Sequence, residues 1–450
     1  MNHNNNIGFL LTRLAGDILL INGAILLAFG IRFLFVVPEY NFRSYQILWP
    51  IISILGPLLF GFFGLYRTEN RSWTEVMASI IVSLIFLTLI LIATSYMIGV
   101  HSFPRSVFAT ALLLQMIILG IWRWFMLQWE AHLAPMIRIL IIAPLAEAGE
   151  IFTRLVHDNY FVIGVIVERL TGKENVTPFK LLGEYRDIPS AFDGGRPDTV
   201  VISSHLPEAV KNLVALNAMR FNIPVVFNPG PYEIMVSQSK IEQIQDTMSF
   251  VAYSKDYPGR EQLKRILDLG ISLGSLILCA PFMILIIISI KLSSPGPIFF
   301  KQERIGLKGR RFQLYKFRTM IPDAERETGP ILASSNDPRV TQVGKLLRAM
   351  RLDELPQLFN VIKGDMSIVG PRPERPYFVK LYETQLPQYH LRHLIKPGIT
   401  GLAQISGRYS MSAKDKLQYD LLYMKNATIL LDLKIILQTI KVVLIPEKAS

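Results

Sequence analysis

The stretch from Arg348 to Arg375 reads RAMRLDELPQLFNVIKGDMSIVGPRPER. Two adjacent carboxylates, Asp353 and Glu354, stand there among four arginines and one lysine. Positive charges close by keep carboxylates ionised, so that they can act as nucleophiles or as hard oxygen ligands for Mg²⁺. Arginine side chains match phosphate oxygens in bidentate geometry. Acids for a metal combined with arginines for phosphates indicate phosphoryl transfer.

The alternative is a solvated helix turn stabilised by ordinary salt bridges, which a charge cluster alone also fits. The backbone pattern favours the first interpretation. Gly364 and the run Gly370-Pro371-Arg372-Pro373 predict a tight, rigid turn. Such a turn would bring Arg372 back toward the helix that carries Asp353.

The segment RLDELPQLFNVIKGDMSIVGPRP, residues 351–373, resembles the core signature of the bacterial sugar transferases. Two further blocks match this family, from SPGP (294–297) to KFRTM (316–320) and from KPGITG (396–401) to Gly407-Arg408. Together the blocks cover about residues 260–445, and several long blocks in order are more specific than one short motif. The family consists of monotopic phosphoglycosyl transferases, which move a sugar 1-phosphate from a nucleotide sugar to a polyprenyl phosphate.

The resemblance implies a role for each matching residue. Asp353 would be the nucleophile of a two-step transfer that passes through a covalent phosphosugar ester. Glu354 would hold Mg²⁺, which neutralises the diphosphate of the donor. The cations expected to bind phosphates or to line the rim of the site are Arg348, Arg372, Arg351, Lys316 and Arg318.

The bulk composition points to a membrane protein. The chain has 450 residues, which predicts about three domains; 51% are hydrophobic and only 18% are charged. The single cysteine, Cys279, excludes a disulfide framework and a cysteine metal site. His390 and His393 share a helical spacing, but we expect surface residues rather than metal ligands there.

The charge distribution favours a phosphate-rich membrane surface over nucleic acid as the partner. The net charge is +12, and residues 255–318 contain twelve Lys or Arg and four Asp or Glu. Two thirds of the whole excess therefore flanks one apolar segment, as expected for contact with lipid headgroups.

Four apolar runs, residues 14–37, 47–66, 77–100 and 107–127, each approach the ~20 residues that a spanning helix needs. They predict a bundle of four transmembrane helices in residues 1–132. The first run lacks the strongly basic start of a cleavable signal peptide. The arginines near the run ends favour a cytoplasmic N-terminus. Asp17 lies near the start of the first helix, where we expect solvation at the membrane interface.

Residues 135–257 alternate between strand-like and helix-like patterns, which predicts a parallel, Rossmann-like α/β domain. Its first turn, from Ile142 to Gly149, has one glycine where a dinucleotide site shows three. We therefore expect the fold without a dinucleotide, in a regulatory or dimerising role. Residues 228–258 are predicted to be a linker containing a strand or a short helix.

Residues 258–450 are predicted to form an α+β catalytic domain with a membrane helix at 264–291. Pro281 lies in the middle of that apolar run, where proline kinks or breaks a helix. Basic residues, Lys264 and Lys291, stand at both ends, so that both ends are expected on the cytoplasmic side. The resemblance likewise implies a re-entrant helix-break-helix, although the family's usual serine before the proline is Ala280 here. The alternative is a fifth spanning helix, which would place the catalytic domain away from nucleotide sugars.

The patterns predict a mixed membrane protein, and the resemblance implies that it lies in the bacterial inner membrane with its catalytic domain facing the cytoplasm. The partners that the resemblance implies are a UDP-sugar, undecaprenyl phosphate, membrane lipid and a second copy of the chain, with Mg²⁺ as cofactor. The reaction that it implies initiates exopolysaccharide, capsule or O-antigen assembly. A polytopic phosphoglycosyl transferase would need many more spans. A non-enzymatic membrane scaffold or sensor would not need the acid pair beside four arginines.

Overall fold

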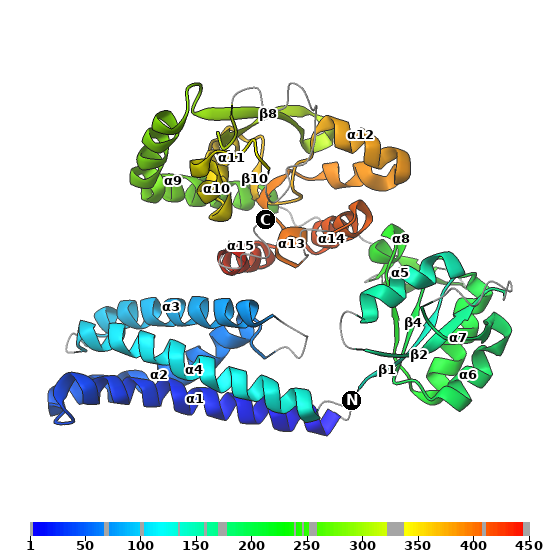
Figure 1. The fold of residues 1–450 in the computed structure, drawn as a ribbon, viewed down its shortest axis with the longest axis horizontal. Coiled ribbons are helices and arrows are strands. Elements are labelled where there is room, and N and C mark those ends of the chain that lie inside the picture. The colour runs from blue at the N-terminus through cyan, green and yellow to red at the C-terminus, as the bar shows by residue number, and fades with distance from the viewer. Residues whose placement is uncertain are drawn as a thin grey trace. The chain divides into compact units, whose positions relative to one another are not determined.

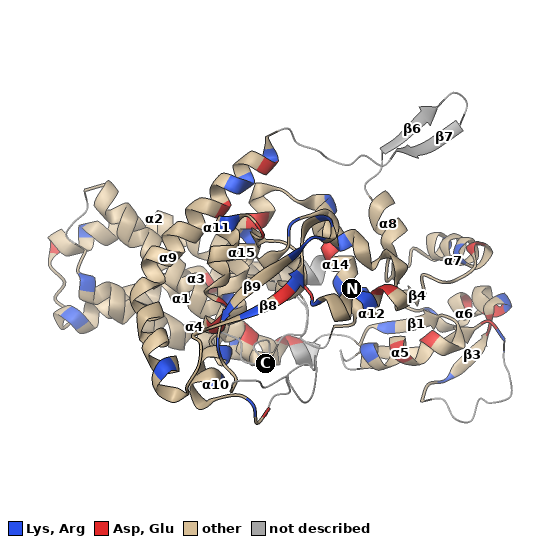
Figure 2. Cartoon of the chain, turned by 90° about the horizontal axis from the view of Figure 1, so that it is seen from above, with Lys and Arg blue, Asp and Glu red and all other residues tan. Residues whose placement is uncertain are grey.

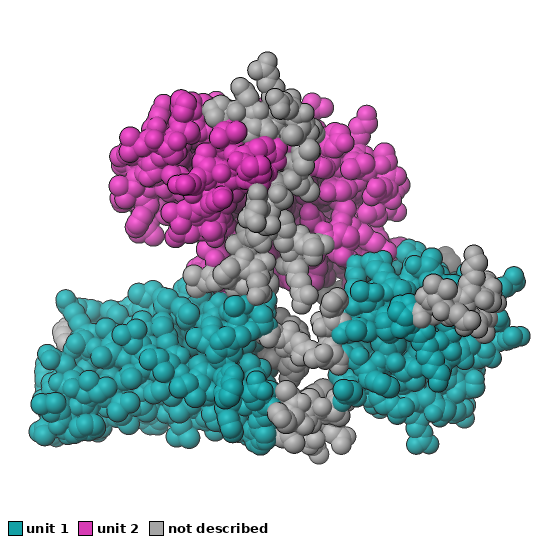
Figure 3. All heavy atoms as spheres, in the orientation of Figure 1, with its two compact units in different colours: residues 1–230 teal, residues 231–450 magenta. Residues whose placement is uncertain are grey.

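The computed structural model divides into two compact units, residues 1–230 and 231–450 (Figure 3). The first unit contains a group of long helices and an α/β domain, and the second contains a long helix and an α+β domain. The described residues are 3–66, 72–99, 103–133, 136–156, 160–169, 178–237, 240–244, 247–251, 259–321, 337–406 and 411–443.

Four long helices open the chain (Figure 1): α1 (His3–Phe33), α2 (Glu39–Phe62), α3 (Trp73–Met97) and α4 (Arg105–Leu133). All four are long and apolar enough to cross a membrane, and few charged residues lie along them (Figure 2). They pack around one apolar core that includes Ile21, Leu48, Leu84 and Val107. The apolar runs of the sequence therefore correspond to these helices.

Two ion pairs link α1 to α4. Asp17 is fully buried, pairs with Arg123, and accepts a hydrogen bond of 2.7 Å from the Tyr66 hydroxyl. Arg13 pairs with Glu130 in the same way. The expectation that Asp17 is solvated at the membrane interface is therefore wrong. A carboxylate can be buried here because the guanidinium compensates its charge, and removing one partner of such a pair typically costs about 3–5 kcal/mol.

The α/β domain is built on a five-stranded parallel sheet in the order β3-β2-β1-β4-β5. Alternate residues of the central strand face two separate apolar clusters: Leu140 and Ile142 face one, Ile139 and Ile141 the other. Helices must therefore cover both faces, which confirms the predicted Rossmann-like class. The strands are β1 (Arg138–Ile142), β2 (Phe161–Val167), β3 (Leu181–Glu184), β4 (Thr199–Ile202) and β5 (Val225–Phe227), and the helices are α5 (Leu145–Val156), η2 (Tyr185–Asp187), α6 (Ile188–Gly195) and α7 (Glu208–Phe221).

The segment expected to be a linker contains the short helix α8 (Pro231–Val236) and an antiparallel hairpin, β6 (Lys240–Ile244) with β7 (Thr247–Val251). The helix is part of the second unit. Ile234 lies in an apolar cluster with Tyr389 and Leu417, and the Lys425 ammonium donates 2.7 Å to the Ile234 carbonyl. The short helix predicted in this segment therefore exists, and it packs on the domain that follows.

Helix α9 (Arg260–Ser293) is the fifth helix in the described residues that is long and apolar enough to cross a membrane. It stays helical through Pro281 and changes direction between its two halves (Figure 1), so the proline bends the helix without ending it. Both halves are held by the second unit. Arg265 donates 2.5 and 2.7 Å to the carbonyls of Val361 and Ile362, while Ile290 packs in a cluster with Phe317.

Apolar residues are exposed along much of α9, including its middle. Ile277, Leu278 and Phe282 are 77%, 75% and 61% exposed. A straight helix of 34 residues would be ~51 Å long and would carry its two ends far apart. In the bent helix, one face of the middle packs on the domain through Leu276 and Met283, while Ile277, Leu278 and Phe282 leave an apolar face exposed.

The rest of the second unit has the predicted α+β class. Hairpin strands β8 (Phe299–Ile305) and β9 (Arg311–Phe317) pack with helices around a core that includes Leu314, Leu358 and Ile435. Helix α12 ends at Gln385, and Pro387 begins a separate 3₁₀ segment. The remaining elements are η3 (Leu307–Gly309), α10 (Gln342–Ala349), η4 (Leu352–Glu354), α11 (Gln357–Lys363), β10 (Ser367–Val369), α12 (Pro376–Gln385), η5 (Pro387–Leu394), β11 (Gly398–Thr400), α13 (Leu402–Ser406), α14 (Ala413–Asn426) and α15 (Ile429–Val443).

Candidate active site

The acid pair sits in a sharp turn between two helices. Helix α10 starts at the cap residue Thr341, whose hydroxyl accepts 3.0 Å from the Gly344 amide. The chain then turns at Arg351, which has a left-handed φ of 55°, a conformation that L residues other than glycine seldom adopt. The 3₁₀ segment η4 follows and presents Asp353 and Glu354 before α11 begins. Asp353 and Glu354 therefore lie in a turn that belongs to neither α10 nor α11.

Glu354 binds two cations at once. Its carboxylate accepts 2.6 and 3.3 Å from the two terminal nitrogens of Arg372 and 3.1 Å from the Lys316 ammonium. Burial alone would raise the pKa of Glu354, but the charges of Arg372 and Lys316 hold that pKa well below its usual range. This carboxylate is therefore ionised at neutral pH and fixed in place.

Asp353 lies beside the same ammonium but is held less tightly. Its Oδ2 is 3.8 Å from Lys316 Nζ, and its side chain is 11% exposed. Burial raises the pKa of Asp353; the Lys316 charge opposes that shift and the Glu354 charge adds to it. The environment thus pushes the pKa values of two neighbouring carboxylates apart, which commonly separates a reacting group from a positioning group.

The structure brings four of the predicted residues together: Asp353, Glu354, Lys316 and Arg372. Arg348 lies at the edge of this group, where its Nε donates 2.9 Å to the Thr319 hydroxyl. Arg351 forms the turn before the acids.

Arg318 points elsewhere. Its guanidinium donates to the carbonyls of Pro295 and Ser294 at 2.9 and 2.7 Å, at the end of helix α9. It is therefore placed to hold the exit of that helix, and a contact with substrate phosphate stays a prediction.

The loop that carries Arg372 is fixed through its backbone. The Gly370 amide donates a hydrogen bond of 2.9 Å to the Thr400 carbonyl, and the Gly398 amide donates one of 2.9 Å to the Pro371 carbonyl. A side chain at position 370 would lie 2.3 Å from the Lys396 carbonyl, so only glycine fits this close approach. The tight turn expected from the glycine and proline pattern therefore exists, and it does bring Arg372 to the acids.

Asn360 is a structural residue of the site that sequence reasoning missed. Its fully buried amide donates 2.7 Å to the Gln313 carbonyl and accepts 3.0 Å from the Tyr315 amide. It thereby ties α11 to strand β9, and so fixes Lys316 beside Glu354. One sequence feature could have indicated its importance: Asn360 is the polar residue within the apolar run Leu358–Ile362.

The acid pair has the right chemistry to share a Mg²⁺ with a substrate. The described residues contain no cluster of three or more metal-ligating side chains. Mg²⁺ sites at phosphates typically need only one or two carboxylates, because substrate oxygens and water fill the other positions. Glu354 retains acceptor capacity beyond its bonds to Arg372 and Lys316, since a carboxylate has about four lone-pair sites. The residues present therefore fit such a metal.

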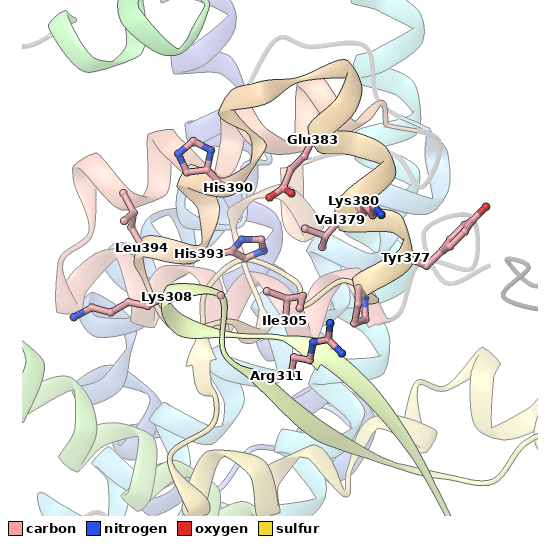
Figure 4. A pocket seen from close by; sticks show the side chains of 12 residues that line it. Ile305, Lys308, Arg311, Tyr377, Val379, Lys380, Glu383, His390, His393 and Leu394 are labelled. Atoms are coloured by element: carbon pink, nitrogen blue, oxygen red, sulfur yellow. The ribbon is translucent and has the colours of Figure 1, made fainter.

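A cavity of about 610 Å³ lies apart from the acids, between η3, α12 and η5 (Figure 4). Its walls include Arg311, His390 and His393, whereas neither Asp353 nor Glu354 lines it. Arg311 and Lys316 are separated by an odd number of positions along β9, so they lie on opposite faces of the hairpin. Burial, with the charges of Arg392 and His390, lowers the pKa of His393 to about 4, so this histidine is neutral at pH 7.

The family model for bacterial sugar transferases matches residues 259–446. Over 185 residues the chain is 43% identical to a UDP-N-acetylgalactosamine-undecaprenyl-phosphate N-acetylgalactosaminephosphotransferase from Aeromonas hydrophila, covering 40% of this chain and 44% of the relative. It is 38% identical over 266 residues to a UDP-glucose:undecaprenyl-phosphate glucose-1-phosphate transferase from Klebsiella pneumoniae, covering 57% of each chain. It is 42% identical over 186 residues to the exopolysaccharide production protein PSS from Rhizobium leguminosarum bv. phaseoli, covering 40% of this chain and 93% of the relative. The chain thus spans about half the length of the first two relatives.

Replacing Asn360 tests whether it holds the site together. Asn360→Leu leaves the Gln313 carbonyl and the Tyr315 amide without their partner, and each buried unsatisfied group costs about 1–3 kcal/mol. We expect a lower thermal unfolding midpoint in detergent and a large loss of activity. The matched control is Asn426→Leu, whose amide bonds to Leu422 within its own helix. Equal behaviour of the two variants would show that Asn360 does not position β9.

Proposed function

This chain belongs to the bacterial sugar transferase family, and we propose that it transfers a sugar 1-phosphate from a UDP-sugar to undecaprenyl phosphate. The observation that carries the proposal is the group of four charged residues, in which Glu354 holds Lys316 and Arg372 beside Asp353. The relatives' names supply the two substrates, a UDP-sugar and undecaprenyl phosphate. The pathway would be assembly of an exopolysaccharide, capsule or O-antigen.

In the proposed first step, an Asp353 carboxylate oxygen attacks the phosphorus that bears the sugar. A bond forms between this oxygen and phosphorus, and the bond from phosphorus to the UMP oxygen breaks. UMP leaves, and the sugar phosphate stays as an ester on Asp353. Asp353 suits this role better than Glu354, because Glu354 is fixed between two cations.

In the second step, an oxygen of undecaprenyl phosphate attacks the same phosphorus. The new phosphorus–oxygen bond gives a lipid-linked sugar diphosphate, and the bond to Asp353 breaks. The carboxylate is thereby regenerated, so the cycle needs no external acid, base or oxidant. The order of products, UMP before lipid, is that of a ping-pong reaction.

Lys316 and Arg372 are positioned to neutralise the negative charge of the donor diphosphate. Glu354 would be the protein ligand of Mg²⁺, which when bound neutralises the diphosphate and stabilises the leaving oxygen. Arg348 and Arg351 would contribute positive charge at the edge of the site.

The exposed apolar middle of α9 supports a place for the enzyme at the membrane surface. We propose that this part dips into one leaflet of the bacterial inner membrane and returns, with the catalytic unit on the cytoplasmic side. Lipid phosphate and soluble nucleotide sugar would then meet at headgroup level. Lys264, at the start of α9, donates 2.8 Å to Asp432 of α15. This contact ties the dip to the domain core.

The Rossmann-like domain remains a candidate for regulation or for dimerisation of the chain. The alternative hypothesis is a purely non-enzymatic scaffold or sensor. Such a protein would not need a buried acid pair with opposite pKa shifts beside Lys316 and Arg372.

The nucleophile is tested by Asp353→Asn in purified membranes. Wild-type protein should release UMP from a UDP-sugar in a panel that includes UDP-glucose and UDP-N-acetylgalactosamine, and should exchange labelled UMP into it. Asp353→Asn should lose both, because an amide oxygen is a far weaker nucleophile than a carboxylate. The control Asp365→Asn, in the same stretch, should keep both. Exchange at the wild-type rate in Asp353→Asn would remove Asp353 from the covalent role.

The metal is tested by chelation. EDTA should stop UMP release, and added Mg²⁺ should restore it. Glu354→Gln should raise the Mg²⁺ concentration needed or abolish turnover, because a neutral amide is a poorer ligand for a hard cation. Glu383→Gln, an acid of the separate cavity, serves as the control. Full activity of wild-type protein in excess chelator would contradict the metal assignment.

The dip is tested by thiol labelling in a Cys279→Ala background. Single cysteines replace Leu263 and Leu292, two exposed residues near the ends of α9. An impermeant reagent should label neither in intact cells and both after permeabilisation. Val36→Cys, in the connection between α1 and α2, should label from outside. Labelling of position 292 but not 263 from outside would show that α9 spans the membrane.

A further inference from the structure

Arg392, in η5, is a buried arginine that the proposed reaction does not use. One of its terminal nitrogens donates 2.9 Å to the backbone carbonyl of Arg372, and the same nitrogen lies 2.9 Å from Asp420 Oδ2. The other terminal nitrogen donates to the Tyr389 hydroxyl. The guanidinium therefore joins η5 and α14 to the loop that carries Arg372.

Arg372 is thus held at both ends. Its guanidinium binds Glu354, and its backbone carbonyl binds Arg392. The Arg372 side chain is 41% exposed, so protein packing alone leaves it considerable freedom. A fixed backbone is what limits the positions that this long side chain can reach.

We infer that Arg392, with Asp420 as its counter-ion, is a positioning residue that sets the place of Arg372 at the acid pair. The inference rests on the proposed function, because it assigns Arg372 to the donor phosphates. Neighbouring contacts act on the same loop: Arg304 donates 3.0 Å to the Pro373 carbonyl, and the Ile305 amide donates 3.0 Å to Glu374. Arg392 is the more deeply buried of the two arginines, with a side chain 2% exposed against 16% for Arg304.

The burial explains why an ion pair is needed at this position. The side chains of Arg392 and Asp420 are 2% and 3% exposed, and a lone buried charge would be strongly unfavourable. Burial raises the pKa of Asp420 to about 6 despite the Arg392 charge, so Asp420 is ionised at pH 7.5. Glu374 and Lys416 are the other charged groups nearby, and they lie 3.6 Å from each other.

The first test is Arg392→Lys, which keeps a positive charge for Asp420 but cannot bind two acceptors with the same planar group. We expect kcat/KM for the UDP-sugar to fall about 10- to 100-fold, because small displacements of a substrate-binding group are costly. The control Arg311→Lys, at an exposed ion pair with Glu303, should stay near wild type.

The second test is a mutant cycle with Arg372→Ala. If Arg392 acts through Arg372, the Arg392→Lys change should cost less than about threefold once the Arg372 side chain is gone. A merely structural role would cost the same factor in both backgrounds, and that result would overturn the inference. Arg392→Met combined with Asp420→Leu removes both buried charges, which often preserves stability. This variant should keep its unfolding midpoint and lose activity as Arg392→Lys does.

Hydrogen exchange of the segment 370–376, measured by mass spectrometry, separates this inference from the proposed function. Exchange should rise in Arg392→Lys and in the double variant, whatever reaction the protein performs. If exchange increases in Arg392→Lys but the wild-type protein releases no UMP, the proposed function is wrong and the positioning role is still supported. Unchanged exchange together with unchanged kcat/KM would overturn the positioning role.

Discussion

The catalytic unit depends on one interaction, the binding of Lys316 and Arg372 by the Glu354 carboxylate. These three residues come from a hairpin strand, a loop and a 3₁₀ turn, and this interaction joins their charged side chains. The two cations balance the two acids, and Arg348 at the edge adds positive charge, which suits a diphosphate. The same cations keep Glu354 ionised, while burial makes the neighbouring Asp353 easier to protonate.

The sequence predicted the long helices, the Rossmann-like sheet and the grouping of Asp353 with Arg372. The helices and the sheet could be predicted because apolar runs near 20 residues and strand–helix alternation are local patterns, which do not depend on contacts between distant segments. Gly370 and Pro371 likewise specified the return of Arg372, because few backbones satisfy that combination. Strand β3 (Leu181–Glu184) escaped prediction, since four residues give too short a pattern.

Other features depend on contacts between distant segments, and sequence patterns do not show such contacts. Asp17 is buried because Arg123, more than a hundred positions away, supplies its counter-charge. Asn360 and Arg392 look like ordinary polar residues until their partners on other elements are known. Arg318 has the charge of a phosphate ligand, yet its contacts are with the end of α9. Pro281 marked the bend, whereas the continued helix depends on packing at both of its halves.

The proposed reaction requires an ester at Asp353, and the most direct measurement of this ester is the mass of the peptide that contains this residue. Protein incubated with its UDP-sugar, without lipid acceptor, is quenched in acid, digested and analysed by mass spectrometry. We expect one added sugar phosphate on Asp353, and we expect it to be absent when undecaprenyl phosphate is supplied before the quench. UMP release with no added mass on that peptide, or with the mass on another residue, would contradict the covalent mechanism.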